Sequence, residues 1–203
     1  MDEKINYQKI FDEQLNIIKL EKKKPTLLLH ACCAPCSSYV LEYLNSFFDI
    51  TLYFYNPNIA PFDEYIFRAN ELTRLVNEMN LSDDVKIIIA EYTPNEFTKM
   101  AIGKEDEQER GSRCTNCYSL RLKKTFEHAQ INKFDYFSTT LSISPHKDAV
   151  RLNNIGFAIS ENSSVKWLYS DFKKKNGYKR SIELSEKHRL YRQNYCGCIY
   201  SKK

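Results

Sequence analysis

Apolar residues follow two different spacings along the chain. Helical spacing predicts an amphipathic helix within residues 1–24, with its apolar positions at Ile5, Ile10, Phe11, Leu15 and Ile18. Short runs rich in β-branched and aromatic residues predict strands at 26–30, 50–55, 85–90 (a buried strand), 134–141 and 165–169. Helical patterns lie between them, at 37–48, 63–80, 94–102 and 115–130, and residues 144–148 are typical of a loop that opens a helix.

This alternation predicts a three-layer α/β fold with a parallel, Rossmann-like sheet, because strands joined by helices form right-handed crossovers. With 203 residues, 42% of them hydrophobic, the chain is long enough for one core, so residues 1–203 are expected to form a single domain. Its parts are an outer N-terminal helix (1–24), a sheet core (25–150) and a C-terminal segment (151–203) in which the pattern weakens.

The N-terminal segment is charged throughout and lacks the apolar centre of a secretory signal. No apolar run approaches the roughly 18 residues that a membrane span needs. These features predict a cytoplasmic protein without membrane contact, in a compartment where thiols stay reduced and structural disulfides are rare.

Positive charge is concentrated at the C-terminal end. Residues 166–203 contain 11 Lys and Arg against 3 Asp and Glu, whereas the whole chain has a net charge of only +4. Aromatic residues are interleaved with these cations, as in segments that bind single-stranded RNA: Trp167, Tyr169, Phe172, Tyr178, Tyr191 and Tyr195. An ordinary solvated surface, with the aromatics in the core, explains any one of these residues equally well.

All seven cysteines fall into three short groups: Cys32, Cys33 and Cys36, then Cys114 and Cys117, then Cys196 and Cys198. An odd number argues against a disulfide framework. Thiols two to four residues apart can reach one centre from a short loop, which is the arrangement that metal ligation requires. The sequence therefore predicts a metalloprotein.

Each group has a local context that favours ligation. Cys33-Ala-Pro-Cys36 follows a predicted strand and opens a helix, where Pro35 suits the first turn and the helix N-terminus favours thiolates. Cys114 and Cys117 also open a helix, after an acidic and apparently mobile segment, 104–110. Gly197 permits a tight turn between Cys196 and Cys198.

Two alternatives stay open from the residues alone. Cys33 and Cys36 could form a thioredoxin-like redox pair, although five cysteines then have no role. Two zinc sites need eight ligands, which the seven cysteines with His30 or His146 could supply in an RNA-binding module. The sequence argues against ATP and NAD as bound cofactors, because residues 30–38 contain no glycine and the chain has no Walker or dinucleotide-binding glycine pattern.

Four motifs together resemble the QueH family of epoxyqueuosine reductases, from about Leu27 to Ser201: LLLHACCAPCS, RCTNCYSLRL, FSTTLSISPHKD and QNYCGCIYS. The resemblance implies a fold similar to that of adenine-nucleotide alpha-hydrolases. It also implies an oxidoreductase of queuosine biosynthesis, which removes the epoxide oxygen from epoxyqueuosine at the tRNA wobble position with electrons from an unidentified donor.

The resemblance further implies a four-iron four-sulfur (4Fe-4S) cluster beside a second metal ion, expected to be iron. The cluster ligands would be Cys32, Cys33, Cys114 and Cys117, and the ligands of the second metal would be Cys36, Cys196 and Cys198. The C-terminal segment would then close the metal site.

Opening an epoxide also requires a proton. Tyr118, His30 and His146 lie near the motifs and are candidate donors, each with a buried structural role as the alternative. Arg113 and Arg121 could meet phosphate or orient thiolates, and exposed surface charge is their alternative.

Overall fold

The computed structural model describes residues 5–21 and 23–201, so parts of the predicted N-terminal segment lie outside it. The strands are β1 (Thr26–His30), β2 (Asp49–Phe54), β3 (Lys86–Ile89), β4 (Tyr136–Thr139) and β5 (Lys166–Trp167). The α-helices are α1 (Tyr7–Ile18), α2 (Ala34–Leu44), α3 (Phe62–Glu78), α4 (Pro94–Ala101), α5 (Ser112–Ile131), α6 (Ala149–Ser160) and α7 (Gly177–Lys187). Short 3-10 helices follow β4 and close the described chain: η1 (Thr140–Ile143) and η2 (Ile199–Ser201).

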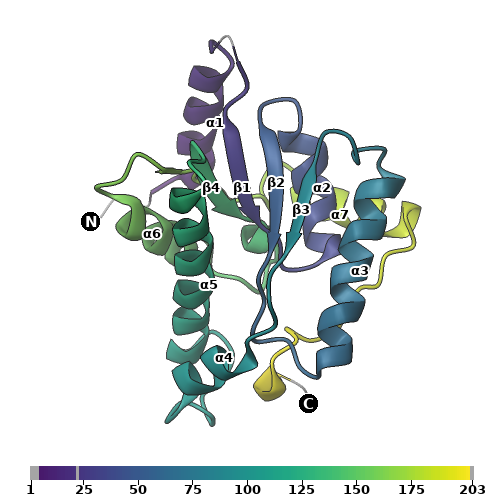
Figure 1. The fold of residues 1–203 in the computed structure, drawn as a ribbon, viewed down its shortest axis with the longest axis vertical. Helices are drawn as coiled ribbons and strands as arrows, with labels where there is room; N and C mark the ends of the chain where they lie inside the picture. The colour runs from purple at the N-terminus through teal and green to yellow at the C-terminus, as the bar shows by residue number, and fades with distance from the viewer. Residues whose placement is uncertain (1–4, 22, 202–203) are drawn as a thin grey trace.

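The five strands form one parallel sheet in the order β3-β2-β1-β4-β5 (Figure 1). β1 lies in the centre, where Leu28 is in register with Thr51 of β2 and Phe137 of β4. The chain leaves β1 toward β2 on one side and returns to β4 on the other. This reversal of strand order makes a crevice at the carboxyl ends of the strands, the usual ligand site of such sheets. The predicted α/β fold is confirmed.

Apolar residues pack on both faces of the sheet and make the three layers. One face is covered by α1, α2 and α3, through buried side chains such as Phe11, Leu41 and Leu72. The other face is covered by α5 and α6, through buried residues that include Leu122 and Leu152. Each fully buried side chain of this size contributes roughly 2 kcal/mol of transfer free energy, so the two apolar layers hold the strand ends in fixed positions.

Two elements differ from the sequence-based expectation. The predicted buried strand 85–90 is an edge strand, β3, whose Ile89 is 41% exposed, because only β2 pairs with it. The helix α7 was not predicted within the C-terminal segment. Its buried face consists largely of the small residues Gly177, Ser181 and Ser185, which pack closely on α2 but give no apolar periodicity.

Within residues 5–21 and 23–201, no helix combines the length and the apolar character needed to cross a bilayer.

Candidate metal and active site

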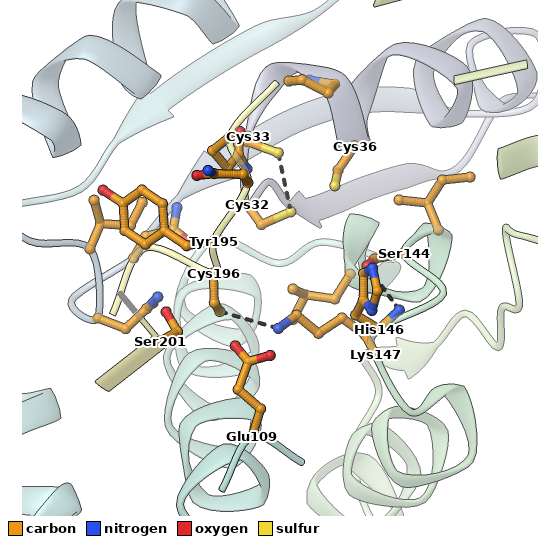
Figure 2. Close-up of a pocket in the computed structure, with 18 of the residues that line it drawn as sticks. Cys32, Cys33, Cys36, Glu109, Ser144, His146, Lys147, Tyr195, Cys196 and Ser201 are labelled. Carbon is orange, nitrogen blue, oxygen red and sulfur yellow. Dashed lines mark hydrogen bonds between the residues drawn. The ribbon is translucent and has the colours of Figure 1, made fainter. Parts of the chain in front are cut away.

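Loops at the carboxyl ends of β1, β2 and β4 surround a cavity of about 1250 Å³, hereafter the larger cavity. The β1 loop contributes the first cysteines, the β2 loop contributes Asn56, Asn58 and Ile59, and the segment after β4 contributes Ser144 to Lys147. Residues 192–201, hereafter the C-terminal strap, contribute much of the remaining wall, and Figure 2 shows Tyr195, Cys196 and Ser201 of this strap. The site therefore forms where the fold predicts a ligand.

Cys32, Cys33 and Cys36, hereafter the three-cysteine group, have sulfur atoms that all lie within 4.8 Å of one another. The Sγ atoms of Cys32 and Cys33 are 3.8 Å apart, and Figure 2 shows the three sulfurs turned toward a common point. Cys33 is the N-cap of α2, with extended backbone, and Pro35 lies in the first turn as predicted. Hydrogen bonds from the other two thiols hold the pKa of Cys33 well below its ordinary value.

The other four cysteines line a smaller, adjoining cavity: Cys114, Cys117, Cys196 and Cys198, hereafter the four-cysteine group. The first two come from the N-terminal turns of α5 and the last two from the C-terminal strap. Burial raises the pKa of the Cys117 thiol to about 11, so a buried cation or metal is needed to stabilise its thiolate. All seven cysteines are free thiols.

Gly197 allows the C-terminal strap to approach the body of the protein. Its φ is +104°, and a Cβ atom at this position would lie 2.9 Å from Nη1 of Arg68. Arg68 is buried, pairs with Glu64 at 2.7 Å and donates to the carbonyl oxygen of Cys196 at 3.4 Å. The amide of Ala60 donates to the Gly197 carbonyl at 3.0 Å. These contacts fix both strap cysteines.

Arg121 lies between the two cysteine groups and lines both cavities. It is fully buried, and its Nη1 is 3.9 Å from Sγ of Cys117. Burial lowers the pKa of Arg121, but the thiolate charges of Cys117 and Cys32 more than offset this effect, and the pKa is raised. The prediction that Arg121 orients thiolates fits this geometry, whereas the surface alternative is wrong.

Lys147 is the second cation between the cavities. Its Nζ donates to Sγ of Cys196 at 3.1 Å (Figure 2). Burial is the largest single influence and lowers its pKa, but the charge of Cys196, its hydrogen bond and the nearby Tyr118 together outweigh burial, and the net shift is upward. Together with Arg121 it places two positive charges among the thiols, which offsets part of the repulsion between bound thiolates.

The three candidate proton donors lie in different surroundings. His30 is completely buried, with Nδ1 against Thr139 at 2.9 Å and Nε2 accepting from Arg121 at 3.3 Å; burial lowers its pKa to about 3. Tyr118 lines only the smaller cavity, and burial raises its pKa to about 12. His146 lines the larger cavity and is exposed. Of the three, His146 has access to a ligand in the larger cavity.

Arg113 has a structural role rather than a place on the surface. It is 1% exposed, and its Nη1 donates to the carbonyls of Lys104 and Glu105 at 2.6 and 2.8 Å. The carboxylate of Glu107 accepts from the Arg113 amide at 2.6 Å and caps α5. The acidic segment 104–110 is therefore held against the helix that carries Cys114 and Cys117, contrary to the mobile character expected of it.

The aromatic residues of the C-terminal segment separate into two sets. Trp167 and Phe172 are buried in the two cores, so the RNA-stacking interpretation is wrong for them. Tyr178 and Tyr195 line the larger cavity, and the guanidinium of Arg68 lies 5.2 Å from the Tyr195 ring. Tyr191, at 37% exposure, lies beside the strap.

Several residues of the site were not identified from the sequence: Asn56, Asn58, Arg68, Lys147 and Gln193. The Asn-Pro-Asn turn directly after β2 was a signal for the first two, because loops after parallel strands carry ligand contacts. Arg68 and Lys147 gave no signal, since a cation within a polar pattern normally predicts a solvent-exposed position.

Seven reduced cysteines, two cations among the thiols and a large crevice at the switch point of a parallel sheet define a class of protein: an α/β enzyme with a thiolate-based metal centre. The sulfur donor set fits iron and zinc, the metals that thiolates favour, and the three-cysteine group alone provides a compact site for one ion.

Comparison with known proteins identifies the family. The family model described as "Epoxyqueuosine reductase QueH" matches residues 27–203. A protein of that name from Streptococcus pyogenes is 45% identical, over 100% of this chain and 80% of its own length. Relatives of the same name from Staphylococcus epidermidis (42% identical, covering 98% and 86%) and Thermotoga maritima (35%, covering 87% and 90%) agree. The chain belongs to the QueH epoxyqueuosine reductase family, as the sequence motifs predict.

Proposed function

We propose that this chain is an oxidoreductase that converts epoxyqueuosine to queuosine in tRNA, within the larger cavity. The observation that carries the proposal is the placement of all seven cysteines on two adjoining cavities at the carboxyl edge of the sheet, in a chain of this family. A volume of about 1250 Å³ is sufficient for a modified nucleoside.

The reaction removes one oxygen atom. Two C–O bonds of the epoxide break, a C=C bond forms, and the oxygen leaves as water after taking up two electrons and two protons. The protein must therefore bind the ring, hold electron carriers beside it and deliver protons to the oxygen.

A 4Fe-4S cluster would supply single electrons and a second metal ion, proposed to be iron, would supply a Lewis acid. The thiols are grouped by cavity rather than by the division that the resemblance implied, because the structure places Cys36 with Cys32 and Cys33. We infer that the four-cysteine group holds the cluster and the three-cysteine group holds the second metal. The total of seven ligands is unchanged, and only the division differs.

The chain's own residues prepare the site for this chemistry. Arg121 and Lys147 place positive charge among the thiols and favour thiolates as ligands. His146 lies on the wall of the larger cavity and is the donor we favour for the proton, because His30 and Tyr118 do not line this cavity. The strap, with Tyr195 on its inner side, limits the access of water.

The proposed partners are tRNA carrying epoxyqueuosine and an electron donor of unknown identity. A tRNA substrate also implies a cytoplasmic location. Lys173 and Lys175 form ion pairs with Asp171 and Asp12, so they contribute less to RNA binding than the sequence suggested. Exposed cations without an ion pair in the described chain lie closer to the strap, at Lys187 and Arg189. We propose that this end of the basic segment contacts the tRNA backbone.

The test is anaerobic purification followed by metal and activity assays. We expect brown protein with more than four irons and about four sulfides per chain. With a chemical reductant, it should convert epoxyqueuosine in tRNA to queuosine, measured by mass spectrometry of nucleosides. Stoichiometric zinc without turnover would instead support an RNA-binding module. A metal-free protein with a titratable Cys33 and Cys36 pair would support thiol redox chemistry.

A further inference from the structure

Three side-chain amide oxygens in the wall of the larger cavity have no hydrogen-bond partner among the described residues. They belong to Asn56, Asn58 and Gln193. Asn56 and Asn58 are 1% and 3% exposed, so water does not compensate them. Buried acceptors without a partner are uncommon in native proteins, because each has lost the hydrogen bond that water gives it in the unfolded chain.

The loop that carries Asn56 and Asn58 is held in place by its own hydrogen bonds. The side-chain nitrogen (Nδ2) of Asn56 donates to the backbone carbonyl of Ala31 at 2.9 Å. This bond fixes the side-chain oxygen of Asn56 as the unpaired end of the amide. The backbone N–H of Ile59 donates to the backbone carbonyl of Asn56 at 3.1 Å, and the hydroxyl of Tyr92 donates to the backbone carbonyl of Ile59 at 2.8 Å. The loop is thus fixed at both ends of the turn, and the acceptors stay in the wall.

Nearby cations do not satisfy these oxygens. Lys147 donates to Cys196, Arg68 pairs with Glu64, and Arg121 contacts His30 and Cys117. The acceptors, that of Asn58 above all, are therefore available to donors that the described residues do not provide.

We propose that Asn58, together with Asn56 and Gln193, forms a binding subsite that accepts hydrogen bonds from hydroxyl or amine groups of the ligand. The subsite rests on the proposed function and deepens it, because the ring that carries the epoxide in epoxyqueuosine also bears hydroxyl groups. Asn58 lines both cavities, so a hydroxyl bound there lies beside both cysteine groups. The subsite thus positions the ring and selects hydroxylated ligands.

A matched control exists in the same chain. Asn153 is also fully buried, but all of its hydrogen-bonding capacity is used. Its oxygen accepts from Trp167 and Ser170, and its nitrogen donates to the carbonyls of Ala149 and Ser170. Replacement by Leu, which has a similar size, should therefore act in opposite directions at the two positions.

The experiment compares Asn58→Leu and Asn153→Leu in the metal-loaded protein. Without substrate, Asn58→Leu should raise the melting temperature by about 2–4 °C, and Asn153→Leu should lower it by at least as much. Asn58→Leu should raise KM for epoxyqueuosine tRNA about tenfold with a smaller change in kcat. Asn58→Ala adds no atom to the turn and should raise KM in the same way. It therefore provides the KM measurement if the Leu variant does not fold.

The subsite would be overturned by a KM that is unchanged in both Asn58 variants, or by a melting temperature that falls in Asn58→Leu as it does in Asn153→Leu. Loss of iron or sulfide from the Asn58 variants would also overturn it, because that result would assign Asn58 to the metal centre. Wild-type protein without turnover would contradict the proposed function instead. In that case, calorimetric titration of the wild-type and Asn58→Ala proteins with free queuosine tests the subsite. Binding to Asn58→Ala that is tenfold weaker than to the wild-type protein would support it.

Discussion

The two cysteine groups are built in different ways. The three-cysteine group comes from five consecutive residues, which span the turn after β1 and the first turn of α2, and it opens into the larger cavity. The four-cysteine group joins the first turns of α5 to the C-terminal strap, and it lines a smaller cavity beside Arg121. One group is therefore local, and the other exists only after the chain has folded.

The difference indicates which group is more easily lost. The end of β1 and the first turn of α2, which contains Pro35, set the spacing of Cys32, Cys33 and Cys36. The hydroxyl of Thr140 adds a contact from the segment after β4, because it accepts from the Cys32 amide at 3.2 Å. Cys196 and Cys198 depend on the contacts of Gly197 with Arg68 and Ala60. We therefore expect the four-cysteine group to respond to changes in the strap, and the three-cysteine group to tolerate them.

Removing thiols from one cysteine group at a time should have the largest effect. Replacing Cys196 and Cys198 with Ala should abolish turnover and remove most of the visible absorbance and sulfide, because two of four proposed cluster ligands are lost. Cys36→Ala should lower turnover by at least tenfold and leave about four sulfides per chain. Iron and sulfide assays on anaerobic protein measure both effects.

Retention of the cluster in both variants would return the ligands to the division that the sequence motifs implied, in which Cys36, Cys196 and Cys198 all hold the second metal. Partial cluster loss in both variants would show a ligand shared between the two centres.

A smaller effect separates strap geometry from thiol chemistry. Gly197→Ala should destabilise the fold by about 1–3 kcal/mol, because its positive φ is strained for Ala and the new Cβ meets Arg68. Gly103→Ala is the matched control, since Gly103 also has positive φ (+73°) but no atom within 4 Å of a Cβ. Urea unfolding should show a larger loss for Gly197→Ala, with reduced sulfide content only in that variant. Equal losses in both variants would mean that the strap is not closely packed.

The smallest effect concerns the basic segment beside the strap. Neutralising Lys187 and Arg189 together should weaken tRNA binding several-fold and reduce the salt slope by about one to two, because exposed cations contact phosphates most directly. Neutralising Lys173 and Lys175 should change the slope less, since both already pair with carboxylates. Filter binding at several salt concentrations gives both slopes, and a larger change for Lys173 and Lys175 would move the RNA surface toward α1.

Much of this architecture was accessible from the sequence. The alternation of apolar runs and helical patterns predicted the parallel sheet, and the first cysteine motif was placed correctly at the end of β1. The spacing could not predict α7, whose buried face is formed by small residues such as Ser181 and Ser185. It could not show that Trp167 and Phe172 are core residues, because aromatic side chains suit both a core and an RNA surface.

The sequence by itself determined the chemical character of this protein: seven thiols in three chelating groups, on a fold that places loops after strands at one edge. These properties depend on residues that are neighbours in the sequence, because the spacing between such residues limits how far apart their side chains can lie. The tertiary structure alone decided which thiols share a cavity, why Arg68 and Arg121 are buried, and why the side-chain oxygen of Asn58 lacks a hydrogen-bond partner among the residues described. These properties depend on contacts between distant segments, and no local pattern of charge or polarity encodes them.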